Sequence, residues 1–159
     1  MSEQDVVAAL RQKARTLYEG REVPHRSSGV ALAEAFDRDH RPYQGLRRGG
    51  VTGDGECGAV VAGRLLLGEM FGYPDPTAPV SLALREAMNL YRAAIASRLQ
   101  TGGARSLVCN EIVHRFPVYH SDERVAFCTD LVGTVAEIVA DIAVQLGATL
   151  EPTPIRRDP

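Results

Sequence analysis

Three cysteines, Cys57, Cys109 and Cys128, carry the side chains of this 159-residue chain that are best suited to reactive chemistry. A thiolate can attack a disulfide or bind a soft metal, whereas a neutral thiol packs like a small apolar group. Because three is an odd number, any intrachain disulfide leaves one thiol unpaired. The sequence therefore opens three alternatives for these residues: redox chemistry, metal binding, and packing in the core.

Local cysteine motifs are missing from the chain, so any site must be assembled by the tertiary structure. There is no C-x-x-C, which excludes a thioredoxin-like motif, no C-x-x-C-H, which excludes covalent c-type haem, and no zinc-ribbon spacing. A mixed cysteine–histidine metal site is an alternative, for which the chain offers His25, His40, His114 and His120. We favour ordinary surface or half-buried histidines, because histidine is a residue of intermediate burial.

A glycine-rich loop precedes Cys57, and its residues Gly53, Gly55 and Gly58 match the dinucleotide-binding pattern G-x-G-x-x-G. That pattern indicates a phosphate site only where it joins a strand to a helix, and no strand pattern flanks it in this chain. A nucleotide site is therefore the less favoured interpretation. The glycines more simply allow tight or left-handed backbone next to the start of a helix.

The thiol of Cys57 is expected at the N-terminus of a helix, with Asp54 as the capping residue. Backbone amides at a helix N-terminus stabilise negative charge, so a thiol placed there becomes a thiolate more easily. The neighbouring carboxylate of Glu56 opposes this effect. The sequence alone therefore leaves open whether the pKa of the thiol is lowered or raised.

Helical spacing of apolar residues dominates the chain, and alternating strand patterns are missing. Ser2 is expected to cap the first helix, and Ser28 to open the second. We expect helices over residues 3–19, 29–36, 57–71, 80–100, 105–116 and 123–146. The predicted fold class is all-α, a bundle of five or six helices with the glycine-rich loop before the central Cys57 helix. It forms one domain over residues 1–150, followed by a flexible C-terminal tail over residues 151–159.

Each cysteine falls on the apolar, core-facing side of its expected helix. On the last helix, apolar residues follow Cys128 in alternating steps of three and four, which predicts a packed seam. The members of this seam are Val132, Val135, Val139, Ile142 and Leu146. Because free cysteine is often buried as a small apolar residue, packing is a strong alternative for each thiol taken singly.

The composition disfavours several classes of partner. A formal charge of −2 and the lack of tryptophan, with only five tyrosines and four phenylalanines, argue against nucleic acid. No apolar run is long enough to span a membrane, and the N-terminus shows no signal-peptide pattern. We therefore expect a cytoplasmic protein with no membrane partner. In that reducing compartment, thiols are free, catalytic or metal-bound rather than locked in permanent disulfides.

Several segments of the chain resemble, in their order and local context, the C-GCAxxG-C-C family, a family of helical proteins associated with redox activity. The resemblance extends over about residues 5–147. Its clearest segments are SGVALAEAF (28–36), GGVTGDGECGAVVAG (49–63), LLLGEMFG (65–72), RSLVCNEIV (105–113) and FCTDLVGTVAEIV (127–139). The resemblance implies a small all-helical protein whose clustered cysteines carry out redox chemistry or bind a redox cofactor. Some related domains lie beside electron-transfer modules.

The chain departs from the family pattern in two places. Ser28 occupies the position of the family's first cysteine, and the GCAxxG core is only loosely kept around Cys57. A hydroxyl cannot form a disulfide and is a poor ligand for soft metals. The departure at Ser28 therefore disfavours a site made of four thiolates and leaves a redox pair with one spare thiol.

Our leading hypothesis is a thiol-based redox protein. In it, Cys57 is the attacking thiolate, favoured by its helix N-terminus, and Cys109 or Cys128 is the resolving partner. Ser28 would donate a hydrogen bond to the thiolate. One alternative is a metal or iron–sulfur binding module with Cys57, Cys109 and Cys128 as the ligands. A third is a non-catalytic helical scaffold, in which the cysteines only pack.

The partners and cofactors follow from these hypotheses. If the protein is an enzyme, we expect an oxidoreductase or an electron-transfer protein. It would act on a redox partner or a small-molecule substrate, as a monomer or a homo-oligomer. A bound cofactor, a metal or an iron–sulfur cluster, would lie against the glycine-rich loop. The cofactor-binding residues we expect there are Ser28, Gly53, Gly55 and Gly58.

Overall fold

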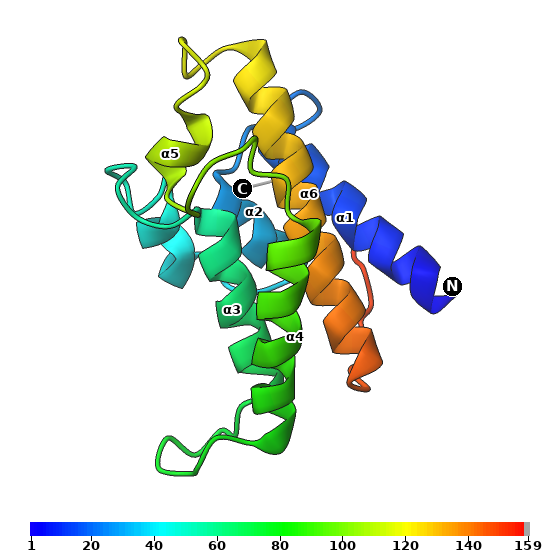
Figure 1. Ribbon diagram of the computed structural model, residues 1–159. Coiled ribbons are helices and arrows are strands. Elements are labelled where there is room, and N and C mark those ends of the chain that lie inside the picture. Colours follow the sequence, from blue (N-terminus) through cyan, green and yellow to red (C-terminus); the bar gives the residue numbers. More distant parts are fainter. Residues whose placement is uncertain (158–159) are drawn as a thin grey trace.

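The computed structural model describes residues 1–157, which form six α-helices and one 3-10 helix (Figure 1). The elements are α1 (Glu3–Glu19), α2 (Ser28–Ala35), η1 (Arg41–Leu46), α3 (Gly58–Phe71), α4 (Leu82–Arg98), α5 (Cys109–Val113) and α6 (Asp122–Gln145). The all-α fold predicted from the sequence is confirmed. Asp158 and Pro159, the end of the predicted flexible tail, lie outside the described residues.

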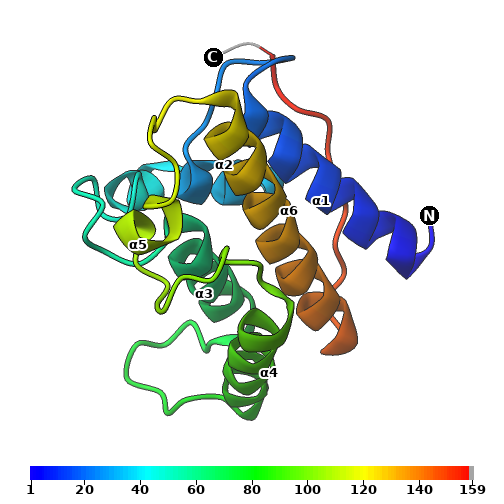
Figure 2. The same cartoon turned by 45° about the horizontal axis from the view of Figure 1, so that its top comes forward.

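Helix α6 forms the centre of the bundle and packs against α1, α2, α3 and α4. Its seam is buried as predicted over four of its five members: Val132, Val135 and Val139 are fully covered, and Ile142 is nearly so. The last member, Leu146, is half-buried at the C-cap of the helix. Helix α1 runs alongside α6 in both views (Figures 1 and 2). The bundle thus holds the first turns of α6, which carry Cys128, against the rest of the core.

Helices α3 and α4 form a hairpin joined by the proline-containing segment 72–81 (Figure 1). Ser81 begins α4 as its N-cap, because its hydroxyl accepts a hydrogen bond from the amide of Leu84 at 3.0 Å. The connection lies at the opposite end of the hairpin from α5 and the glycine-rich loop. It therefore leaves the first residues of α3, where Cys57 lies, free to pack against those two segments.

The predicted start of α1 is correct, whereas the starts of the other five α-helices differ from the predicted ones. Ser2 makes a capping box with Asp5. The N-cap of α2 is Ser27 rather than Ser28, and the N-cap of α3 is Cys57 rather than Asp54. Asp54 does not cap because its carboxylate instead accepts a hydrogen bond from the side-chain amide of Asn110 at 3.0 Å.

The fifth helix is shorter than predicted and begins at Cys109 instead of residue 105. The three residues before Val108 form bends, and Val108 itself is extended and forms an isolated antiparallel bridge with Glu56. Backbone groups at this point are satisfied across the bridge rather than within a helix. The bridge is a long-range pairing between segments about fifty residues apart, so helical spacing in the sequence could not indicate it.

The C-terminal segment contacts the bundle before it leaves the described residues. The ammonium group of Lys13, which is buried on α1, donates hydrogen bonds to Asp37 at 3.3 Å and to the hydroxyl of Thr153 at 3.0 Å. That hydroxyl donates in turn to Asp37 at 2.7 Å. The flexibility expected for residues 151–159 stays a prediction, with Thr153 as a point of attachment.

We expect the substitution Gly68→Ala in α3 to stabilise the protein by about 1 kcal/mol, the difference in helix propensity between the two residues. A β-carbon at Gly68 would meet nothing within 4 Å. At Gly63 on the same helix, it would lie 2.2 Å from the hydroxyl oxygen of Tyr91, so Gly63→Ala should destabilise instead. Chemical denaturation gives the free energy of unfolding of both variants. An equal change in the two variants would contradict the packing described for α3.

Candidate functional site

Cys57 and Cys109 are held side by side by the bridge between Glu56 and Val108. The amide of Cys57 donates to the carbonyl of Leu107 at 2.7 Å, and the amide of Cys109 donates to the carbonyl of Gly55 at 2.9 Å. In an antiparallel pair, these two cysteines follow the bridged residues and share one face, diagonally opposed. The bridge therefore joins the starts of α3 and α5 and places both thiols on the same side.

The glycine-rich loop wraps closely around the start of α5. The carbonyl of Gly53 accepts a hydrogen bond from the amide of Asn110 at 2.9 Å. A β-carbon at Gly49 would lie 2.4 Å from the Cβ atom of Cys109, and Gly49 has a left-handed backbone with φ 60°. These glycines thus allow close backbone packing beside a cysteine, which favours the simpler interpretation of the pattern over a phosphate-binding loop.

Cys57 is buried, with 8% of its surface exposed, and caps the N-terminus of α3. Burial raises the pKa of its thiol to about 12, although the amides of Val60 and Ala59 at the start of the helix favour the thiolate. Negative charge at Cys128 and at Cys109 raises the pKa further. The helix N-terminus is therefore present as predicted, but desolvation outweighs it.

Cys109 is half-buried and lies against the guanidinium group of Arg48. The Nη1 atom of Arg48 donates a hydrogen bond to the sulfur at 3.0 Å. Burial raises the pKa of this thiol above its ordinary value, and the charge and the hydrogen bond of Arg48 offset only part of that rise. Of the two thiols on the bridge, Cys109 is the more accessible and the one with a cation beside it.

Cys128 is half-buried in the second turn of α6, beside the guanidinium group of Arg124. Only 4% of Arg124 is exposed, and its Nε atom donates to the carbonyl of Tyr119 at 2.6 Å. A second donor nitrogen, Nη1, reaches the hydroxyl of Tyr18. Burial works against the charged guanidinium, but Tyr18 and a hydrogen bond with Cys128 favour it, and the pKa of Arg124 is raised.

The ring of Tyr119 lies close to both arginines. Its centre is 4.3 Å from the Cζ atom of Arg48 and 3.9 Å from that of Arg124, so each guanidinium makes a cation–π contact with it. Among the described residues, neither arginine forms an ion pair with a carboxylate. The site therefore combines three thiols with two cations that no carboxylate neutralises.

Arg48, Tyr119 and Arg124 were not predicted as site residues from the sequence. Arg48 stands in the glycine-rich region with a left-handed φ of 52°, and its role arises from tertiary packing that no local spacing indicates. Arg124 lies four residues before Cys128 on α6, a spacing that makes two side chains neighbours on a helix and that could have indicated it.

Ser28 lies beside the start of α3, next to the residue that follows Cys57. A β-carbon added at Gly58 would lie 2.8 Å from the hydroxyl oxygen of Ser28. No hydrogen bond among the described residues joins Ser28 to Cys57. Ser28, which the resemblance seen in the sequence aligns with a cysteine, is therefore adjacent to the Cys57 segment, while its expected hydrogen bond to a thiolate is not seen among the described residues.

The three cysteines do not fit a metal or an iron–sulfur cluster held by all of them. Within residues 1–157, no group of three or more histidine, cysteine, aspartate or glutamate side chains is arranged so that it could hold a metal ion. The ligand set expected for the metal alternative is therefore not assembled in this fold.

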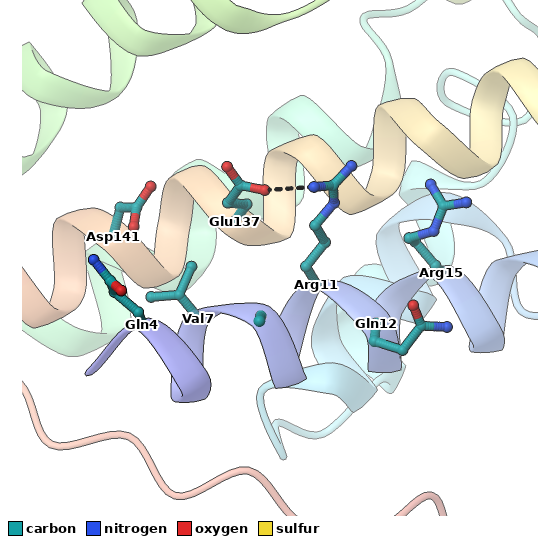
Figure 3. A pocket seen from close by; sticks show the side chains of 8 residues that line it. Gln4, Val7, Arg11, Gln12, Arg15, Glu137 and Asp141 are labelled. Atoms are coloured by element: carbon teal, nitrogen blue, oxygen red, sulfur yellow. Dashed lines mark ion pairs between the residues drawn. The ribbon is translucent and has the colours of Figure 1, made fainter. Parts of the chain in front are cut away.

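A hollow between α1 and α6 lies apart from the thiols (Figure 3). It is spanned by an ion pair of 3.0 Å between Arg11 and Glu137. Glu137 also pairs with Arg98 of α4, at 2.7 Å. This network ties three helices together, so we assign the hollow a structural role.

The described chain also contains no helix long and apolar enough to cross a membrane.

Comparison with protein families matches residues 30–142 to the family described as "Putative redox-active protein (C_GCAxxG_C_C)". The chain belongs to this family. Membership in the C_GCAxxG_C_C family confirms the resemblance seen in the sequence and supports a redox role at this coarse level. The match begins at Val30, so it leaves Ser28 outside the matched residues. Comparisons with curated proteins and with solved structures gave no match.

The burial of Cys57 predicts a loss of stability at alkaline pH. The thiol titrates near pH 8.5 in the unfolded chain, but only at about 12 in the folded protein. Between these values unfolding releases a proton, so the free energy of unfolding falls as the pH rises, by about 1.4 kcal/mol per pH unit. The free energy of unfolding, measured by denaturation from about pH 9 to pH 11, should fall less steeply with pH for Cys57→Ala than for the wild type. The same dependence on pH in both proteins would contradict the burial of Cys57.

Proposed function

We propose that this protein reduces disulfides by thiol–disulfide exchange, with Cys109 as the attacking thiolate and Cys128 as the resolving thiol. The observation that carries the proposal is the 3.0 Å hydrogen bond from Arg48 to the sulfur of a half-exposed cysteine. A neighbouring cation and partial exposure are the two features that distinguish reactive cysteines from inert ones. Family membership supports the redox theme without naming the reaction.

This assignment revises the one expected from the sequence, in which Cys57 attacks. The helix N-terminus that favoured Cys57 is real, but a thiol whose pKa is about 12 is almost wholly protonated at neutral pH. The thiolate, not the thiol, is the nucleophile. Cys109, which has an arginine at its sulfur, is therefore the better candidate for attack, and Cys57 is assigned a packing role at the start of α3.

Cys128 is the better resolving partner because of its position. In a regular antiparallel pair, the diagonal positions of Cys57 and Cys109 place their Cα atoms roughly 7–8 Å apart. Cysteines more than about 7 Å apart need backbone movement before they can form a disulfide. Cys128 comes from α6 rather than from the bridge, so the spacing of the bridge does not separate it from Cys109. The contribution of its charge to the raised pKa of Cys109 supports a short distance between the two thiols.

The reaction proceeds in two exchange steps. The thiolate of Cys109 attacks one sulfur of the substrate disulfide, forms a mixed disulfide and releases the first substrate thiolate. Cys128, as a thiolate, then attacks the sulfur of Cys109 and releases the second substrate thiolate, which leaves a disulfide between Cys109 and Cys128. Two electrons pass from the protein to the substrate, and the two protons lost by the protein thiols are taken up by the released thiolates. A dithiol reductant or redox partner regenerates the protein.

The charges around the site favour an anionic disulfide as the substrate. When Cys109 enters the mixed disulfide it loses its negative charge, and Arg48 loses its counter-charge. A carboxylate on the substrate can replace that charge, because Arg48 and Arg124 have no carboxylate partner within the described chain. Exchange with such a substrate also accords with the cytoplasmic location that we propose, where small thiols keep the protein reduced.

The proposal is tested by the kinetics of exchange with small disulfides. We expect the reduced protein to react with glutathione disulfide, which is anionic, faster than with cystamine, which is cationic. Cys109→Ala should abolish the reaction, Cys128→Ala should stop it at the mixed disulfide, and Cys57→Ala should retain it. Loss of reaction only in Cys57→Ala would restore the assignment from the sequence, and failure of the wild-type protein to react would overturn the proposed function.

A further inference from the structure

A second feature of the molecule is a groove of about 720 Å³ that none of the cysteines lines. It lies between the exposed side of α4 and the segment that connects α4 to α5, with the first turns of α3 beneath. Its volume falls within the range of small-molecule sites, roughly 300–1,000 Å³. The groove does not belong to the thiol site or to the ion-pair network between α1 and α6.

The lining of the groove has an apolar part and a basic part. The apolar side chains come from three segments and are Val60, Met88, Tyr91, Ile95, Leu99 and Leu107. Tyr91 is fixed in the floor, because its hydroxyl donates a hydrogen bond to the carbonyl of Val60 at 2.7 Å. The apolar part therefore offers a preformed surface for a hydrocarbon body.

The basic part consists of three arginines on three different segments: Arg64 of α3, Arg92 of α4 and Arg105 of the connecting segment. Arg64 already pairs with Glu56 at 2.8 Å. Among the ion pairs of residues 1–157, none includes Arg92 or Arg105. No acidic side chain lines the groove. Two cations on opposite walls are thus available to an anionic group placed between them.

We propose that this groove binds a small amphipathic carboxylate, with the hydrocarbon body on the apolar floor and the carboxylate at Arg92 and Arg105. The proposal rests on charge complementarity: the arginines supply cationic donors, and the apolar side chains of the lining offer contacts to a hydrocarbon body. A purely polar anion lacks the hydrocarbon body and would contact only the arginines. An uncharged alkane chain lacks the carboxylate and would contact only the apolar floor. The site is independent of thiol exchange, because its residues are not those of the redox site.

Octanoate is the probe for this site. Titration followed by ¹H–¹⁵N NMR should give saturable shifts at residues lining the groove, with a Kd on the order of 1 mM or below for a ligand of this size. Octanol, which lacks the charge, should bind about tenfold more weakly, since a hydrogen bond to a charged group is lost. Shifts centred on Arg48 and Arg124 would place the anion at the thiols instead and overturn the proposal.

Two variants separate charge from shape. The double variant Arg92→Gln/Arg105→Gln should weaken octanoate binding about tenfold and leave octanol binding unchanged. Ala96→Phe, an exposed position in the groove wall, should obstruct both ligands. Arg85→Gln, an exposed arginine of α4 outside the groove, is the matched control and should bind like the wild type. Equal octanoate affinity in the double variant and the control would refute the assignment.

Discussion

Arg48→Met is expected to slow the reaction of Cys109 with glutathione disulfide at neutral pH by about three- to fifteenfold. A hydrogen bond to a charged group is worth about 1.5–3 kcal/mol, so its loss raises the pKa of the thiol by about one to two units. A rise of about one to two pKa units lowers the fraction of Cys109 present as thiolate by about one to two powers of ten. The remaining thiolate is more nucleophilic, because nucleophilicity rises with pKa with a Brønsted coefficient of about 0.4–0.5, and this offsets about half of the loss. Stopped-flow measurement of the first exchange step gives the rate.

The pH profile distinguishes this effect from a loss of structure. At a pH high enough to ionise Cys109 in both proteins, Arg48→Met should react as fast as the wild type or faster, because its thiolate is the stronger nucleophile. Arg47→Met is the control: Arg47 is the exposed neighbour on the same loop, and within residues 1–157 its side chain donates one hydrogen bond, to Gln44 at 3.5 Å. A rate deficit that persists unchanged at every pH would mean that Arg48 does not act on the ionisation of Cys109.

Gly49→Ala is expected to destabilise the protein by about 2–5 kcal/mol. Two physical terms add at this position. A left-handed backbone costs a residue with a β-carbon about 1–2 kcal/mol. The added carbon would also lie 2.4 Å from the Cβ atom of Cys109 and 2.8 Å from the carbonyl oxygen of Gly55. Neither neighbour can rotate away, so the bridge must shift.

Gly50→Ala separates the cost of the left-handed backbone from the cost of the close contacts. Gly50 is also left-handed, with φ 72°, but a β-carbon there would meet nothing within 4 Å. It should therefore cost only the backbone term, about 1–2 kcal/mol. Urea denaturation of both variants gives the difference, and alkylation of Cys109 should change in Gly49→Ala alone. Equal destabilisation would show that the loop does not press on Cys109 as described.

The fold could be predicted from the sequence where local patterns decide it. Apolar residues repeat along α6 in steps of three and four, and Val132, Val135 and Val139 are buried accordingly. The capping box at Ser2 is likewise a local pattern, and α1 spans the residues predicted for it. The start of α5 could not be predicted, because Val108 pairs with Glu56 across the chain and that pairing overrides the helical spacing.

The cysteines of the candidate site could be predicted from the sequence, whereas the arginines beside them were not predicted. The three thiols were identified from residue type, and the resemblance to a redox-active family indicated that they cluster. Their relative reactivity depends on burial, which made Cys57 the least accessible of the three despite its helix N-terminus. It also depends on Arg48, which reaches Cys109 from a distant segment, and on Arg124, which lies four residues before Cys128 on α6. Neither burial nor a distant cation leaves a periodic signal in the sequence.

The pairing of Cys109 with Cys128 is the central claim, and it is tested most directly by mapping the disulfide in oxidised protein. The reduced protein is treated with glutathione disulfide, remaining thiols are alkylated, and the peptides are identified by mass spectrometry without reduction. The account predicts one intrachain disulfide, between Cys109 and Cys128, and alkylated Cys57 only after unfolding. A disulfide that contains Cys57, or fully alkylated Cys109 and Cys128 with no disulfide, would contradict it.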